Sequence, residues 1–216
     1  EEGDALTWVR LAVSGDSVLI GSKLGMTIHF RLNENELRPL GRTARGVRSM
    51  NLRSGDSLVS MDVLPVELAD RIDKSPEENI EITQGLTVND GPWVLVASAN
   101  GLGKRVPVTQ FRLQKRAGMG LKAIKFRIKG DELVGLRVLG KGEELLLVSE
   151  RGVIVRTSAD QISQQSRAAT GVRLQKLDDG DRLSQMVLVP RESEEVLTNK
   201  DDEKKSSIDN ESITTN

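Results

Sequence analysis

Three short segments of the chain combine glycine with arginine or lysine in one repeated order. In each, a glycine precedes an apolar residue and a basic residue follows: Gly46-Val47-Arg48, Gly120-Leu121-Lys122 and Gly171-Val172-Arg173. Cationic side chains on such loops can neutralise the phosphates of a nucleic-acid backbone. Any single one is equally well explained as solvated surface charge, but the clustering favours binding. We predict as phosphate contacts Arg42, Arg45, Arg48, Lys104, Arg105, Lys115, Arg116, Lys122, Arg167 and Arg173.

Other chemistries fit the sequence less well. Gly101-Leu102-Gly103-Lys104 resembles a phosphate loop, but Arg105 follows where a nucleotide-binding loop needs Ser or Thr and a helix. The chain has no Cys and one His, His29, which is too little for a zinc site or a catalytic triad and indicates a partly exposed structural histidine. We therefore expect no catalytic residue, no metal site and no cofactor in this chain.

The elements that would position the basic loops repeat with them. Gly-Asp pairs begin at residues 3, 55, 130 and 180, a spacing of about fifty residues with one longer interval, and an apolar run follows each pair. Glycine can supply the positive φ of a turn and aspartate can accept backbone hydrogen bonds, so these pairs indicate turns. A calcium site is the less favoured interpretation, because one carboxylate per turn makes a poor cage.

Each repeat also contains two short apolar runs separated by a glycine, at Gly25, Gly101 and Gly152. This pattern is typical of a β-hairpin, and the apolar period of two disfavours a helical solenoid. About four strands per repeat predict an all-β, propeller-like fold. Complete units begin near residues 16, 91 and 142, and residues 3–11 resemble the end of a further unit. We expect an incomplete ring of roughly three to four blades.

The domain boundaries follow from composition. Residues 1–190 are expected to form the propeller-like domain, with residues 65–90 as a surface insertion. Residues 191–216 are polar and carry four basic against eight acidic residues, which leaves 27 of the 31 basic and 24 of the 32 acidic residues in the rest of the chain. We expect this acidic tail to be disordered. No apolar run is long enough to span a membrane, and we expect a cytoplasmic protein without a membrane partner.

Two kinds of partner remain for the basic loops. Blades in a ring would place equivalent loops on one rim, where their charges form a belt that suits bent duplex DNA. Only 2% of the residues are aromatic, which argues against single strands, whose bases stack on aromatic side chains. The alternative is a propeller scaffold whose basic loops bind an acidic protein.

The motifs resemble one known family. Residues 37–48 with Gly55-Asp56, residues 99–105 and residues 167–173 closely resemble the C-terminal domain of the DNA gyrase A subunit, over about residues 3–190. That resemblance implies a β-pinwheel, a six-bladed propeller variant that exchanges strands between blades. It also implies that the domain wraps double-stranded DNA on its rim, which supports ATP-dependent negative supercoiling by a type II topoisomerase.

The chain departs from that family in two ways. The basic box Gln-Arg-Arg-Gly-Gly-Lys-Gly of the first blade is absent, so the topoisomerase IV subunit is a close second resemblance. Type II topoisomerases cleave DNA through a tyrosine, and this chain contains no Tyr. The resemblance therefore implies a wrapping module that is inactive alone. Its partners would be the gyrase B subunit together with the remainder of the gyrase A subunit, while ATP and Mg²⁺ would act elsewhere in the enzyme.

Overall fold

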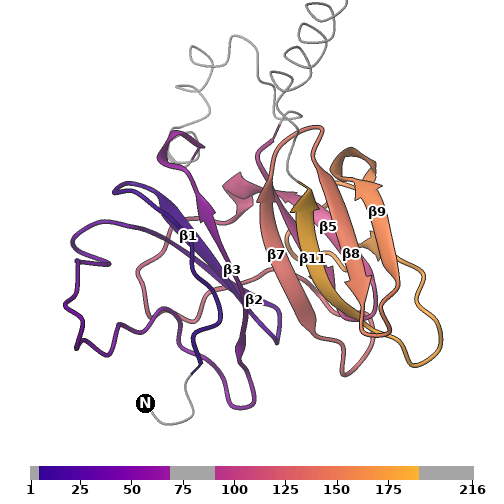
Figure 1. The fold of residues 1–216 in the computed structure, drawn as a ribbon, viewed down its shortest axis with the longest axis horizontal. Helices are drawn as coiled ribbons and strands as arrows, with labels where there is room; N and C mark the ends of the chain where they lie inside the picture. Colours follow the sequence, from indigo (N-terminus) through magenta and orange to yellow (C-terminus); the bar gives the residue numbers. More distant parts are fainter. Residues whose placement is uncertain (1–4, 69–90, 190–216) are drawn as a thin grey trace, which may run out of the picture.

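The computed structural model describes residues 5–68 and 91–189, which form three antiparallel β-sheets (Figure 1). Most of the expected insertion and the whole acidic tail lie outside the described residues. Within those two ranges, no helix is long and apolar enough to cross a membrane. The sheets coincide with the three repeats, which confirms the all-β, propeller-like prediction.

The first sheet takes three strands from the first repeat and one from the second. The strands are β1 (Ser17–Ser22), β2 (Met26–Arg31), β3 (Leu58–Leu64) and β6 (Leu121–Lys122). Their order across the sheet is β3-β1-β2-β6. Strands β1 and β2 form the hairpin predicted around Gly25, which has a φ of 80°. The strand at the end of the sheet is therefore supplied by the next repeat.

The second sheet has the same plan. It contains β4 (Trp93–Ser98), β5 (Leu102–Pro107), β7 (Leu133–Leu139) and β10 (Val172–Arg173) in the order β10-β5-β4-β7. A short 3-10 helix, η2 (Val108–Gln110), follows β5. Here β10 comes from the third repeat and pairs with β5, as β6 pairs with β2.

The third sheet has three strands, in the order β11-β8-β9. They are β8 (Glu144–Ser149), β9 (Ile154–Ser158) and β11 (Leu183–Val189), with the 3-10 helix η3 (Ala159–Gln161) after β9. The second and third repeats thus each supply four strands, as predicted. Only three of the four stay in the repeat's own sheet, and each of these two repeats donates the other strand to the sheet before it.

The sheets are held together by apolar cores between their faces. Leu19 and Leu64 of the first sheet pack with Val94 and Val96 of the second. On the other face of the second sheet, Leu95 joins the core shared with the third sheet. Successive residues of β4 thus serve two cores, as expected for a strand that is buried on both sides. Valine and leucine therefore contribute much of the core in a chain of which only 2% of the residues are aromatic.

The Gly-Asp pairs close each repeat. Asp56 accepts a hydrogen bond from the Ser22 hydroxyl at 2.7 Å and another from the Leu24 amide at 2.9 Å. Asp131 accepts from the Asn100 amide, and Asp181 from the Arg151 amide. Each carboxylate therefore joins the turn before β3, β7 or β11 to the hairpin turn of the same sheet. These contacts support the turn interpretation.

Residues 5–13, which resembled the end of a further unit, form no strand in the structure. Leu6 and Leu11 are 88% and 98% exposed, while the half-buried Trp8 lines a pocket together with Gly135 of β7 and Met186 of β11. The segment therefore reaches this pocket through Trp8 and pairs with no strand.

We predict that Asp181 stabilises the third repeat in a pH-dependent way. Hydrogen bonds from the Ser149 hydroxyl and from backbone amides lower the pKa of Asp181 below its ordinary value of 3.8. The stability that this carboxylate contributes is therefore present above about pH 4 and is lost as the pH falls through the lowered pKa. Urea unfolding should give the wild type a higher free energy of unfolding than Asp181→Asn at pH 7, and this difference should disappear in acid. Asp179→Asn, at an exposed neighbour, is the control and should show no such gap.

Candidate nucleic-acid interface

Three basic residues occupy the same position in the three repeats. Lys122 and Arg173 each follow the first residue of a donated strand, β6 or β10, and both are exposed. Each donated strand lies at one end of its sheet, opposite the strands β3 and β7 that face the neighbouring sheet. Arg48 is the equivalent residue of the first repeat and is also exposed, in a segment outside the sheets.

The backbone conformation explains why each motif contains a glycine. Gly46, Gly120 and Gly171 have φ values of 81°, 75° and 90°, a region that disfavours residues with a Cβ atom. A Cβ on Gly120 would also lie 2.6 Å from the Thr27 carbonyl oxygen, and one on Gly171 would lie 2.6 Å from that of Gly103. The glycines thus let each donated strand approach the sheet that receives it.

Three other predicted contacts are exposed: Arg42, Arg45 and Lys115. They lie in the loops that lead into the glycine motifs of the first and second repeats. Together with Arg48, Lys122 and Arg173, they are the predicted cations that the structure leaves accessible to a large partner.

Arg116 and Arg167 instead join neighbouring repeats. Arg116 Nη1 donates to the Arg48 carbonyl at 2.6 Å, and Arg167 Nη1 donates to the Lys122 carbonyl at 2.5 Å. Since Arg48 and Lys122 are equivalent, the two arginines make the same contact at successive junctions. Their backbone amides also match, because they donate to the side chains of Glu36 and Gln110, respectively. Both arginines therefore fasten a basic loop to the preceding repeat.

Lys104 is fully buried, and its ammonium group has protein partners. Nζ donates to the carbonyl oxygens of Ser166, Arg167 and Ala169 at 2.9, 2.6 and 2.6 Å. Burial, with a smaller contribution from the Arg167 charge, lowers the pKa of Lys104 to about 8. The prediction of a phosphate contact does not fit this placement. Sequence could not reveal it, because a lysine in a strand next to glycine is normally exposed.

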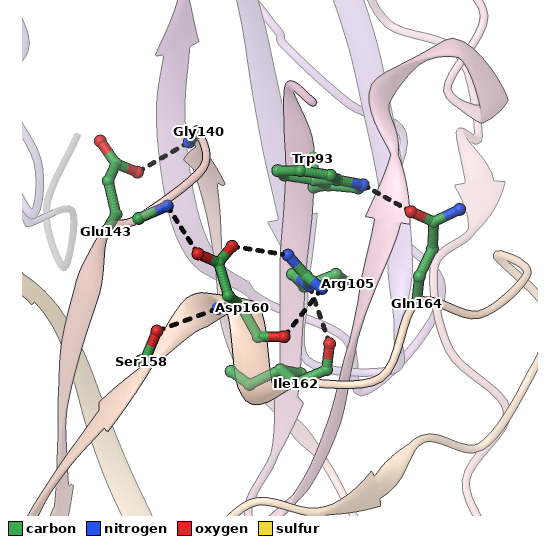
Figure 2. A network of polar contacts seen from close by, with 9 residues as sticks. Trp93, Arg105, Gly140, Glu143, Ser158, Asp160, Ile162 and Gln164 are labelled. Carbon is green, nitrogen blue, oxygen red and sulfur yellow. Dashed lines mark hydrogen bonds and ion pairs between the residues drawn. The ribbon is translucent and has the colours of Figure 1, made fainter. Parts of the chain in front are cut away.

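Arg105 is also committed to the protein (Figure 2). Its guanidinium carbon lies 4.5 Å from the centre of the Trp93 ring, a cation–π geometry. Nε donates to the Ile162 carbonyl at 2.8 Å, and Nη1 lies 3.2 Å from an oxygen of Asp160. With its side chain only 12% exposed, Arg105 holds η3 of the third repeat against the second sheet and is not placed to bind phosphate.

His29 makes the equivalent contact at the first junction. Its Nδ1 lies 2.6 Å from the Phe111 carbonyl, and Phe111 follows η2 as Ile162 follows η3. Because a carbonyl oxygen can only accept, Nδ1 carries a proton there. Nε2 lies 2.6 Å from the Ser17 hydroxyl. His29 is 1% exposed, so it is structural as predicted but buried, and the expectation of partial exposure is corrected.

Sequence reasoning missed the two side chains that accept hydrogen bonds from the backbone amides of Arg116 and Arg167. Glu36 and Gln110 each precede an apolar residue, Leu37 or Phe111, in the stretch of chain before a basic loop. The sequence does carry a sign of them, because each repeat has a Glu or Gln at this position. In the third repeat it is Gln161, which precedes Ile162. It becomes interpretable only when the structure shows that the acceptor and the arginine come from different repeats.

We predict that Lys104→Met lowers the free energy of unfolding by about 1–3 kcal/mol at pH 7, because buried carbonyl groups lose their donor. The pKa of Lys104 is about 8 when folded and 10.5 otherwise. The unfolded chain therefore holds more protons between these values, so wild-type stability rises with pH there relative to the variant. In urea unfolding, the difference in free energy of unfolding between the wild type and Lys104→Met should widen from pH 7 to pH 10. Lys129→Met, at an exposed lysine, should show neither effect, and a constant gap in Lys104→Met would contradict the assignment.

Comparison with known proteins places the chain in a family. The family model described as "DNA gyrase C-terminal domain, beta-propeller" matches residues 16–65, 92–139 and 143–190, one match for each sheet. The DNA gyrase A subunit of Synechocystis sp. is 50% identical over 204 residues, which cover 91% of this chain and 24% of that protein. The DNA gyrase A subunit of Staphylococcus epidermidis is 37% identical over 194 residues, which cover 90% of this chain and 19% of that protein.

Solved structures agree with the family match. A DNA gyrase A C-terminal domain superposes with a TM-score of 0.65 and 26% identity, covering 83% of this chain and 52% of that one. A topoisomerase IV C-terminal domain, at 20% identity, shares the fold with a TM-score of 0.63, covering 81% of this chain and 46% of that one. The chain thus spans about a quarter or less of the length of these two gyrase relatives. It belongs to the family of DNA gyrase C-terminal domain β-propellers.

Proposed function

We propose that this chain binds duplex DNA along the ends of its sheets that carry the donated strands and wraps it as part of a gyrase A subunit. The observation that supports this most strongly is the repeated exposed cation, Arg48, Lys122 and Arg173, at one position of three successive repeats. Regular cations on one side of an arc suit a polymer with regularly spaced phosphates. The family relationship supports the same conclusion.

The binding would be electrostatic and largely independent of sequence. Lysine and arginine release counterions when they neutralise phosphates, so affinity falls steeply with salt. Such contacts position a duplex without reading its bases. The contact set is the exposed group Arg42, Arg45, Arg48, Lys115, Lys122 and Arg173. Lys104, Arg105, Arg116 and Arg167 act by holding the loops that present these cations.

Wrapping would serve the whole enzyme. In the proposed assembly, the gyrase B subunit together with the remainder of the gyrase A subunit cleaves and passes DNA in the cytoplasm, with ATP and Mg²⁺ bound outside this chain. The chain supports negative supercoiling by setting the path of the duplex. Cleavage belongs to another part of the assembly, since a type II topoisomerase uses a tyrosine and this sequence has none.

Charge reversal at the donated strands tests the proposal. Gel-shift titrations of short and long duplexes across a salt series should show tighter binding to the longer duplex. The double variant Lys122→Glu/Arg173→Glu should bind every sequence more weakly. Its dependence of log K on log salt should be shallower by about one for each contact removed. Lys129→Glu, in the turn before the inner strand β7, is the control and should bind nearly as the wild type does.

Two outcomes would contradict this function. Equal affinity of the double variant and the wild type would remove the assigned contacts. Absence of duplex binding at low salt, together with saturable binding to an acidic protein, would instead favour the scaffold alternative.

A further inference from the structure

The segment that begins at Arg48 in the first repeat runs beside the basic loop of the second repeat. Arg116 Nη1 donates to the Arg48 carbonyl. Three residues further along the segment, the Asn51 amide donates to the Gly118 carbonyl at 2.9 Å. The side chains of Arg48 and Asn51 are both exposed. The surface between the first two repeats is therefore formed by these two positions of the segment and by the loop that they contact.

The second junction repeats this arrangement with the segment that begins at Lys122. Arg167 Nη1 donates to the Lys122 carbonyl. Three residues further along, the Lys125 amide donates to the Ala169 carbonyl at 3.2 Å. Lys122 and Lys125 are both exposed. Lys125 is thus the structural equivalent of Asn51, and its backbone lies beside the loop that leads to Arg173.

The two junctions place an additional lysine on opposite sides of the loop. The segment carries Asn51 at the first junction and Lys125 at the second. The loop shows the reverse exchange, because Lys115 of the second repeat corresponds to Ser166 of the third. Lys115 and Lys125 are both exposed. Each junction therefore has one exposed lysine besides the repeated exposed cation described above.

The surroundings of Lys125 favour an anionic partner. The side chain that accepts from the loop amide is the neutral Gln110 at this junction, whereas it is the carboxylate Glu36 at the first. The carbonyl groups of the loop are held from inside the protein by the Lys104 ammonium group. Cations thus outnumber anions at these equivalent positions of the second junction, which makes the local potential positive.

A duplex that contacts both Lys122 and Arg173 has to cross this junction. The chain from Arg167 to Arg173 connects the two contacts, and the Lys125 backbone lies against Ala169 in the middle of that connection. Lys125 follows Lys122 by three residues, so their Cα atoms are at most about 11 Å apart. Duplex DNA carries one negative charge per about 1.7 Å of its axis. Phosphates are therefore available to Lys125 along this path.

From this placement we infer that Lys125 is a further phosphate contact, which holds duplex DNA where it crosses from the second repeat to the third. Lys115 has the corresponding role at the first junction, from the other side of the loop. Asn51 occupies the position at which the first junction lacks such a contact. The inference rests on the proposed function and adds a contact between successive members of the repeated exposed cation.

Reciprocal substitutions at the two equivalent positions test the inference. Lys125→Asn removes one contact, so the slope of log K against log salt for a long duplex should become shallower by about 0.9. The loss of affinity between about 50 and 200 mM salt should then be about 3.5-fold smaller than in the wild type. Asn51→Lys should steepen the slope by the same amount, and Lys125→Asn/Asn51→Lys should return it to the wild-type value. Lys125→Arg keeps the charge and should keep the slope.

Lys129→Asn is the matched control, because it removes the same charge from an exposed lysine in the turn before β7. Its slope in fluorescence anisotropy titrations should stay close to that of the wild type, and circular dichroism would establish that every variant is folded. A slope that Lys122→Glu/Arg173→Glu reduces but Lys125→Asn leaves unchanged would overturn this inference alone, as would an unchanged slope in Asn51→Lys. A wild type that binds no duplex at low salt would overturn the proposed function as well.

Discussion

The structure depends on backbone hydrogen bonding between repeats. The strand at the end of a β-sheet exposes amide and carbonyl groups that must find partners. In the first two sheets those partners come from the following repeat, through β6 and β10. The apolar cores between sheets and the arginine clamps reinforce a connection that the backbone has already made. The repeats are consequently one continuous structure, unlike propeller blades that each complete their own sheet.

The basic residues fall into two groups, those that bind the neighbouring repeat and those that remain exposed. Lys104, Arg105, Arg116 and Arg167 direct their charges at carbonyl groups of the adjoining repeat, where a cation can satisfy several acceptors at once. Arg48, Lys122 and Arg173 lie on the segments so held, with their side chains exposed. The first group fixes the loops, and the second is left for a partner. Clustering of charge in the sequence therefore overstates the number of direct contacts.

The sequence predicted the repeat, the strand type and the hairpins, because alternating apolar residues and turn glycines are local signals. It also indicated correctly that His29 is structural. It could not separate Lys104 from Lys122, since each closely follows a glycine and the two differ only in what the next repeat places above them. Burial of Lys104 under residues 166–169 is a contact between segments far apart in the chain, and no local pattern encodes it.

The direction of strand donation has a consequence for the order of folding. Each donated strand passes from a later repeat to an earlier sheet, so a repeat that has just been synthesised cannot complete its sheet until its successor has emerged. Because domains generally fold from the N-terminus during synthesis, every nascent repeat passes through a stage with an open edge. The hairpin and Gly-Asp turn contacts within each repeat are local enough to form during that stage. They can hold the repeat in shape until its last strand arrives.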